Sequence, residues 1–198
     1  PGPGASEPNE HRLGILFARG GRHNGVPLAG PCTMTLRAPP KLLTIDLDDT
    51  LWPCEPPIRL AESRLTDWLA GVAPRLALAH DRDSLSRHRR GLMRDRPDLA
   101  HDVTALRTAS LRLLLRDFGY PESLAEQGMW VFLEARNRVE PYPDVVRVLR
   151  DLVGRFRLVS VTNGNSDPGQ TPLRGLFHHS LTAGAVGAAK PDPALFHQ

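Results

Sequence analysis

The feature that most constrains this chain is a short apolar segment that ends in a cluster of acids. Residues 42–47 read Leu-Leu-Thr-Ile-Asp-Leu, and residues 46–50 read Asp-Leu-Asp-Asp-Thr. A nearly continuous apolar run of this length is typical of a buried strand in a parallel sheet. The segment therefore predicts an α/β core with polar chemistry at the carboxyl end of its first strand.

A second segment of the same kind lies at residues 156–161, Phe-Arg-Leu-Val-Ser-Val, and runs into Thr-Asn-Gly at residues 162–164. Before it, valine and leucine recur at helical spacing through residues 143–153, which begin with Pro-Asp, a favourable helix start. A helix that leads into a buried strand is the repeating unit of α/β proteins. We therefore expect a parallel sheet.

Residues 56–140 show helical patterns and no clear strand. Apolar residues recur at helical spacing in three stretches, and the breaks fall at Gly71, near Pro97 and at the Gly-Tyr-Pro of residues 119–121. The three stretches are about 58–72, 103–117 and 124–135. This pattern predicts a helical insertion between the first strand and the rest of the core.

Glycine and proline are concentrated at the start of the chain, where they make up 14 of the first 40 residues against 22 of the other 158. Residues 1–40 are therefore predicted to be a disordered leader. The chain begins with Pro1, and Met34 stands just before the first strand. We take Met34 as the expected native start.

The charge is nearly balanced, with 25 basic and 22 acidic residues and a net charge of +3. Arginine is densest in residues 87–96, where a nucleic-acid patch and a solvated helix face are both conceivable. Acids flank these bases and no aromatic residues lie among them, which favours the solvated face and predicts no nucleic-acid partner.

No apolar stretch is long enough to cross a bilayer, and no secretory signal is visible. The two cysteines, Cys32 and Cys54, do not suggest a disulfide framework. We expect a cytoplasmic protein without a membrane partner. The oligomeric state is left open.

Asp46 and Asp48, two residues apart at a strand end, can divide the work of an enzyme, since one attacks while the other exchanges protons. Their oxygens also suit Mg²⁺. Thr162, with the backbone amides that follow it, can hold phosphoryl oxygens. The alternatives are an acidic turn at the first strand and an ordinary Asn-Gly turn at the second.

Lys190 is one of only two lysines among the 25 basic residues, the other being Lys41. It is followed by Pro-Asp-Pro. In a chain that otherwise uses arginine, a lysine suggests a position where a compact charge is needed. The alternative is that the two prolines simply begin a helix.

In this order, the three motifs resemble those of the haloacid dehalogenase-like hydrolase superfamily, over about residues 41–198. The resemblance implies an α/β fold with a Rossmann-like, three-layer core, a parallel sheet and an inserted α-helical cap. Residues 41–55 and 141–198 would form the core, and residues 56–140 the cap.

The resemblance also implies roles. Asp46 would attack phosphorus and form an aspartyl-phosphate, and Asp48 would protonate the leaving oxygen and then activate water. Mg²⁺ would be held by the Asp46 side chain and the Asp48 backbone carbonyl. Thr162 would bind phosphoryl oxygens and Lys190 would neutralise charge. The other substrate-binding positions at the two strand ends would be Thr50, Asn163 and Gly164.

Asp48 distinguishes two activities within the superfamily. Displacement of a halide needs no proton, and the dehalogenases generally lack an acid at this position. The resemblance therefore implies a phosphatase that acts on a small phosphorylated metabolite.

A narrower similarity, to bacterial phosphatases of the riboflavin pathway, covers the residues after Thr162 and the segment that follows His101. Such enzymes act on 5-amino-6-(5-phospho-D-ribitylamino)uracil, and related ones accept FMN. His101, Asp102 and Arg107 are then candidate specificity residues. The alternative is that Asp102 only caps a helix and Arg107 lies on its exposed face.

The superfamily has a fourth motif with further acids for the metal, usually well beyond the lysine. This chain stops at Gln198, eight residues after Lys190. We expect that the C-terminal part of the core is missing and that the chain is a truncated form with little activity. The alternative is a non-catalytic binding or regulatory module.

Overall fold

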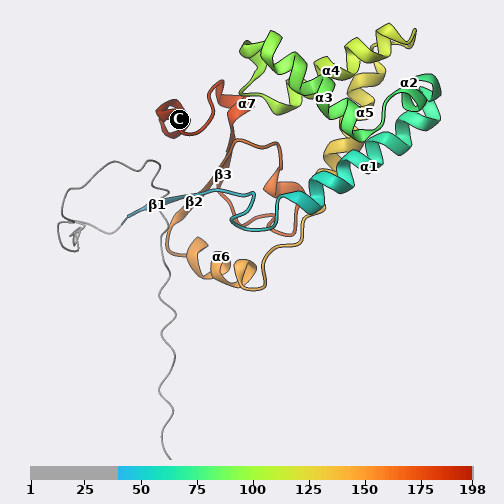
Figure 1. Ribbon diagram of the computed structural model, residues 1–198. Helices are drawn as coiled ribbons and strands as arrows, with labels where there is room; N and C mark the ends of the chain where they lie inside the picture. Colours follow the sequence, from blue (N-terminus) through green and yellow to red (C-terminus); the bar gives the residue numbers. More distant parts are fainter. Residues whose placement is uncertain (1–39, 198) are drawn as a thin grey trace, which may run out of the picture. The chain divides into compact units, whose positions relative to one another are not determined.

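The computed structural model describes residues 40–197 (Figure 1). The expectations of a leader and of a start near Met34 lie outside this range. Within it, the strands are β1 (Leu42–Ile45), β2 (Arg157–Thr162) and β3 (His179–Thr182). The helices that follow β1 are α1 (Glu55–Val72), α2 (Pro74–Ala79), α3 (Arg82–Asp95), α4 (Val103–Asp117) and α5 (Leu124–Arg136). Those of the core are α6 (Val145–Val153) and α7 (Ala183–Val186).

The three strands form a parallel sheet in the order β1-β2-β3. Leu43 pairs with Leu158, and Val159 pairs with His179. The predicted α/β fold with a Rossmann-like parallel sheet is confirmed. The strand that the sequence did not reveal is β3, because its four residues, His-Ser-Leu-Thr, are short and largely polar.

Apolar residues cover β2 on both faces, whereas Leu42 and Thr44 of β1 are exposed, so the first strand is less buried than its sequence predicts. On one side Leu158 of β2 belongs to the same buried cluster as Val145 and Leu149 of α6. On the other, Val159 and Val161 pack with Leu195, which lies in a short 3₁₀ helix, Pro193–Phe196. Because successive strand residues point to opposite faces, this alternation places helices above and below the sheet.

The helices α1 to α5 build a second apolar core of their own, seen together in Figure 1. Leu65 and Leu69 of α1 are buried there with Met129 and Phe132 of α5. The close approach of α1 and α5 depends on Gly128, where a Cβ atom would lie 3.0 Å from the ring of Trp68.

The end of α1 differs from the expected break at Gly71. The helix continues to Val72 and stops at Ala73, whose backbone leaves the helical region. Pro74 explains the stop, since the residue before a proline is disfavoured in the α conformation. No helix in residues 40–197 is long and apolar enough to cross a membrane.

Leu69→Ala should lower the free energy of unfolding by about 2–5 kcal/mol, because it leaves a cavity where α1 meets α5. Val72 is exposed on the same helix, so Val72→Ala is the matched control. It should change the free energy of unfolding by about 0.5 kcal/mol or less. Urea denaturation followed by circular dichroism measures both. Equal effects of the two substitutions would contradict the packing described here.

Candidate active site

The carboxyl ends of β1 and β2 lie side by side, because the two strands are parallel and Ile45 pairs with Ser160. Asp46 follows β1 directly, and Asn163 follows β2. The sheet therefore brings the first two sequence motifs to one edge, where the strand ends of α/β proteins bind ligands.

Lys190 reaches the same edge from a loop. Its Nζ lies 2.6 Å from Asp46 Oδ1 and donates to the carbonyl of Val161 at 2.8 Å. Asn163 holds the loop in place, because its Oδ1 accepts from the Lys190 amide at 2.7 Å and its Nδ2 donates to the Lys190 carbonyl at 3.1 Å. The third motif thus joins the first two.

Asp48 is held from a different direction, by the helical insertion. Arg136, at the end of α5, donates from Nη2 to both carboxylate oxygens at 2.6 Å. Trp52 Nε1 donates to Oδ1 at 3.0 Å. Arg136 is only 2% exposed, and within the described residues its Nη1 is buried without a hydrogen-bond partner. A buried guanidinium of this kind is costly unless it is paired.

The turn after β1 separates the acids. Asp49 has a positive φ of 57°, and its Oδ1 accepts from the Cys54 amide at 2.8 Å, which stabilises the turn. Thr50 is exposed, and its amide donates to the Leu47 carbonyl at 3.2 Å. Asp49 is therefore a structural acid of the turn, whereas Asp46 and Asp48 project from it toward their basic partners.

Gly164 makes the closest approach to Asp48. A Cβ atom at this position would lie 2.6 Å from Asp48 Oδ2 and 3.3 Å from Thr162 Oγ1. The Thr162 hydroxyl is buried and accepts from the Gly164 amide at 2.9 Å. Only glycine fits here, so the Asn-Gly turn is required by packing against the carboxylate.

A cavity of about 410 Å³ opens beside Asp48. The core contributes Asn163, Gly164 and Asn165 to its wall. The helical insertion contributes four arginines: Arg89, Arg90, Arg107 and Arg136. Cys54 also lines the cavity, and burial, with the Asp48 charge, raises the pKa of its thiol. The cavity therefore combines the strand ends of the core with a basic wall.

The candidate specificity residues occupy different places. Arg107 lines the cavity and its side chain is only 12% exposed, so the alternative of an exposed helix face is wrong for it. Asp102 caps α4, accepting from the amides of Thr104 and Ala105 at 3.0 and 2.9 Å. Its carboxylate also packs against Gly184. His101 is half-buried and is not part of the cavity wall.

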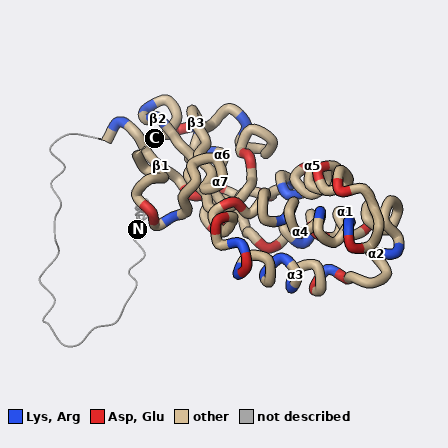
Figure 2. The backbone as a smooth tube through the Cα atoms, turned by 90° about the horizontal axis from the view of Figure 1, so that it is seen from above, with Lys and Arg blue, Asp and Glu red and all other residues tan. Residues whose placement is uncertain are grey.

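The arginine-rich segment is largely the expected solvated face, since Arg87, Arg90, Arg94 and Arg96 are exposed, and Arg89 is the exception. Figure 2 shows its basic positions along α3. Arg89 turns inward, lines the cavity and has a side chain only 19% exposed. Arg89 and Arg136 were not found from the sequence, because an arginine on an amphipathic helix is ordinarily a surface residue.

The metal donors are few. In residues 40–197 no group of three or more His, Cys, Asp or Glu side chains could hold a metal ion. Asp46 is half-exposed, and its Oδ2 makes no hydrogen bond to any described residue, so one carboxylate oxygen is open. Mg²⁺ typically takes one or two carboxylates together with waters and substrate phosphate. The donors at the end of β1 fit such a partial site.

The parallel sheet and the residues at its carboxyl edge define the class of protein. Residues 40–198 match the haloacid dehalogenase-like hydrolases, and the chain belongs to that family. The expected resemblance is confirmed.

Among particular relatives, the chain is 32% identical to the 5-amino-6-(5-phospho-D-ribitylamino)uracil phosphatase YigB of Escherichia coli (strain K12). The match covers 78% of this chain and 66% of the relative, so the chain spans just under two thirds of that protein's length.

Solved structures give the same fold. A 2-haloacid dehalogenase from Pseudomonas syringae pv. Tomato DC3000 is 40% identical, with a TM-score of 0.74, over 80% of this chain and 70% of that one. The magnesium-bound HAD hydrolase YfnB from Bacillus subtilis is 20% identical, with a TM-score of 0.50, over 80% of this chain and 70% of its own. The second likeness concerns the fold alone.

Gly164→Ala should lower the free energy of unfolding by about 1–3 kcal/mol, since the added methyl group displaces the Asp48 carboxylate or the turn. Gly154→Ala is the matched control, because nothing lies within 4 Å of a Cβ there and its φ is −76°. That variant should be unchanged or more stable by about 0.4–1 kcal/mol. Thermal unfolding of both variants tests this, and a neutral Gly164→Ala would contradict the close approach.

Proposed function

We propose that the chain is a Mg²⁺-dependent phosphomonoester hydrolase that works through an aspartyl-phosphate intermediate. Its substrate is a small phosphorylated metabolite, a flavin precursor or FMN. The observation that supports this best is the Asp46–Lys190 contact of 2.6 Å at the end of β1, with Asp48 two residues away. Phosphoryl transfer mainly requires positioning and neutralisation of charge, and this arrangement offers both.

Asp46 is the nucleophile in this proposal. A carboxylate oxygen attacks phosphorus, the bond from phosphorus to the ester oxygen breaks, and the phosphoryl group is carried on Asp46. Lys190 Nζ, held by the Val161 carbonyl at 2.8 Å, stays beside the reacting oxygens and offsets their negative charge. Water then attacks phosphorus and restores the free carboxylate.

Asp48 is the acid and base. It gives a proton to the departing ester oxygen and later takes one from the attacking water. Both of its oxygens accept hydrogen bonds from Arg136 Nη2 at 2.6 Å. Donation of a proton therefore requires the contact with Arg136 to loosen, which a substrate entering the adjacent cavity can bring about.

The phosphoryl oxygens are bound at the end of β2. Thr162 Oγ1 accepts from the Gly164 amide at 2.9 Å, which leaves the hydroxyl proton available to a ligand. The Asn163 amide and the exposed hydroxyl of Thr50 would add further donors. Mg²⁺, held by the Asp46 side chain and the Asp48 carbonyl, would supply further neutralisation of phosphate charge.

Dehalogenation is the second candidate, because the structurally similar protein from Pseudomonas syringae is a 2-haloacid dehalogenase. A halide leaves without a proton, so that reaction has no use for Asp48. The position of Asp48 beside Asp46 and the cavity favours the phosphatase. The 32% identity to YigB, which carries a phosphatase name, supports the same choice.

Asp46→Asn should abolish phosphate release from FMN, since the nucleophile is lost. Asp48→Ala should slow it by roughly 10²–10⁴-fold, the usual contribution of an acid–base group. Asp49→Asn is the matched control, because it retains an acceptor for the Cys54 amide and should keep the rate within about twofold. Phosphate release is measured in the presence of MgCl₂.

The same assay separates the alternatives. Wild-type turnover by Asp46→Asn would rule out the proposed nucleophile. Chloride release from 2-chloropropionate, without phosphate release, would make the chain a dehalogenase. Binding of FMN without any turnover would point to a binding or regulatory module.

A further inference from the structure

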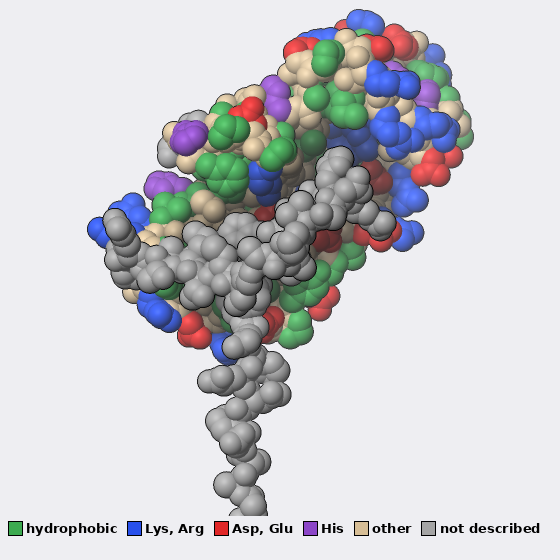
Figure 3. Space-filling model, turned by 60° about the vertical axis from the view of Figure 1, so that its left-hand side comes forward, with side chains coloured by type: hydrophobic (Ala, Val, Ile, Leu, Met, Phe, Trp, Pro, Cys, Tyr) green, Lys and Arg blue, Asp and Glu red, His purple; other side chains and the backbone are tan. Residues whose placement is uncertain are grey.

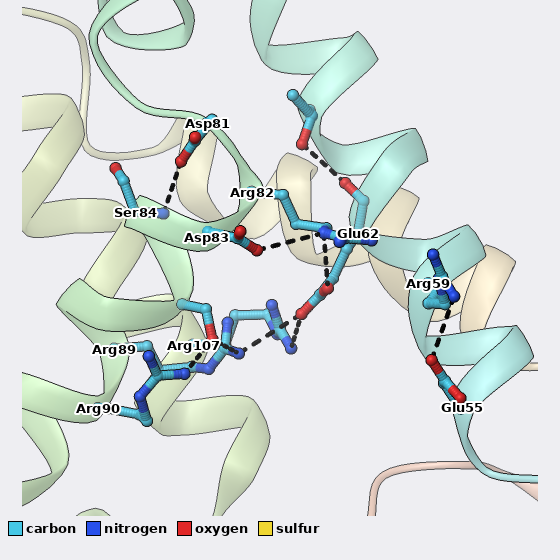
Figure 4. Close-up of polar contacts among 12 residues, drawn as sticks. Glu55, Arg59, Glu62, Asp81, Arg82, Asp83, Ser84, Arg89, Arg90 and Arg107 are labelled. Atoms are coloured by element: carbon cyan, nitrogen blue, oxygen red, sulfur yellow. Dashed lines mark hydrogen bonds and ion pairs between the residues drawn. The ribbon is translucent and has the colours of Figure 1, made fainter.

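One carboxylate in the helical insertion serves three arginines. Glu62 of α1 lies 3.9 Å from Arg82 and 3.5 Å from Arg89, both of α3, and 3.7 Å from Arg107 of α4 (Figure 4). These distances exceed the roughly 3.2 Å of a well-made hydrogen bond. The carboxylate is thus shared among its partners and satisfies none of them fully.

The three arginines differ in their surroundings. Arg82 is 44% exposed, also contacts Asp83 at 3.7 Å and does not line the cavity. Arg89 and Arg107 are 19% and 12% exposed and line it. Figure 3 shows Lys and Arg side chains gathered in one region of the surface, with acidic side chains beside them.

Positive charge exceeds negative charge in this part of the cavity. Arg89, Arg90 and Arg107 lie in its wall, and the carboxylate that serves the first and last of them is Glu62. Asp48, the acid in the wall, is already engaged by Arg136. Arg136 itself keeps a buried Nη1 without a hydrogen-bond partner in residues 40–197. The wall therefore has donors to spare.

The excess charge is energetically costly. Burial lowers the pKa of Arg107 to about 9, and the neighbouring Arg89 charge acts in the same direction. Burial also lowers the pKa of Arg89. An arginine keeps its proton in proteins, so the cost is not relieved by deprotonation. An anionic or electron-rich ligand in the cavity would relieve it.

The rest of this wall is apolar. Ile58, Met93, Val103 and Leu106 line the cavity beside Arg107. The Arg107 guanidinium carbon lies 3.9 Å from the centre of the Phe132 ring, a stacking that fixes the direction of its remaining donors. A ligand that fills this space would carry a ring or another apolar body.

We propose that Arg89 and Arg107, held by Glu62, form a second binding subsite that recognises acceptor oxygens on the leaving group of the substrate. The substrate is then a phosphomonoester with an apolar ring whose far edge carries a carboxylate or ring carbonyl oxygens. This rests on the proposed function, since Asp48, which lines the cavity and lies two residues from Asp46, marks its phosphate end. Glu62 is a positioning residue that spaces the two guanidinium groups.

The test measures binding in excess EDTA, so that Mg²⁺-dependent turnover contributes no heat. The 198-residue chain is titrated calorimetrically with phenyl phosphate, 4-carboxyphenyl phosphate and 4-carbamoylphenyl phosphate. An acceptor oxygen that receives a hydrogen bond from a charged donor should tighten binding about tenfold or more over phenyl phosphate. The carboxyl and carbamoyl probes show whether a charged or a neutral oxygen is preferred.

Arg107→Gln and Arg89→Gln should each remove most of this preference, so that the two substituted probes bind about as tightly as phenyl phosphate. Arg107→Lys retains the positive charge but loses the planar guanidinium group, so it should keep only part of the preference for the substituted probes. Arg82→Gln is the matched control, because Arg82 contacts Glu62 outside the cavity. This variant should keep the full preference for the substituted probes. Circular dichroism confirms that each variant is folded.

Equal binding of the three probes by the wild-type chain, or a preference that survives in Arg107→Gln, would overturn the subsite, as would no binding of any probe. A chain that shows the preference but releases no phosphate would refute the proposed hydrolysis and retain the subsite. A chain that hydrolyses all three probes and binds them with equal affinity would refute the subsite and retain the proposed hydrolysis.

Discussion

The ion pair between Asp48 and Arg136 is the interaction on which the proposed site depends. It joins an acid at the end of β1 to the last helix of the insertion, with both carboxylate oxygens 2.6 Å from one nitrogen. Because Arg136 is almost fully buried, loss of either partner would leave an uncompensated charge. The pair therefore fixes the acid and, at the same time, one wall of the cavity beside it.

The proposed site has two chemically different parts. At the strand ends, Asp46 offers an open oxygen and Lys190 offers a charge, as phosphoryl transfer requires. Toward the helices, Arg89 and Arg107 stand among apolar side chains with one shared carboxylate. A family that retains its core chemistry can change substrate by changing such a wall, since function depends on the site more than on the fold.

Sequence alone revealed the core half of the site better than the helical half. Asp46 and Thr162 could be placed because each lies at the end of a strand whose pattern is visible, and parallel strands bring their carboxyl ends to one edge. Lys190 stood out because it is one of only two lysines in the chain. Arg136 and Glu62 could not be placed from the sequence, because charged residues on amphipathic helices are usually solvated. Only the packing of α1, α3, α4 and α5 turns these two side chains inward.

The pairing of Leu42 with Arg157 joins residues separated by more than half of the chain. Closing so long a loop costs conformational entropy before any strand contact is gained. The helices between them have their own apolar core, in which α1 and α5, near the two ends of the insertion, pack together, so they can form first and bring the two strands nearer. The order of folding would then run from the insertion to the sheet, and the two aspartates would reach working geometry only in the final step.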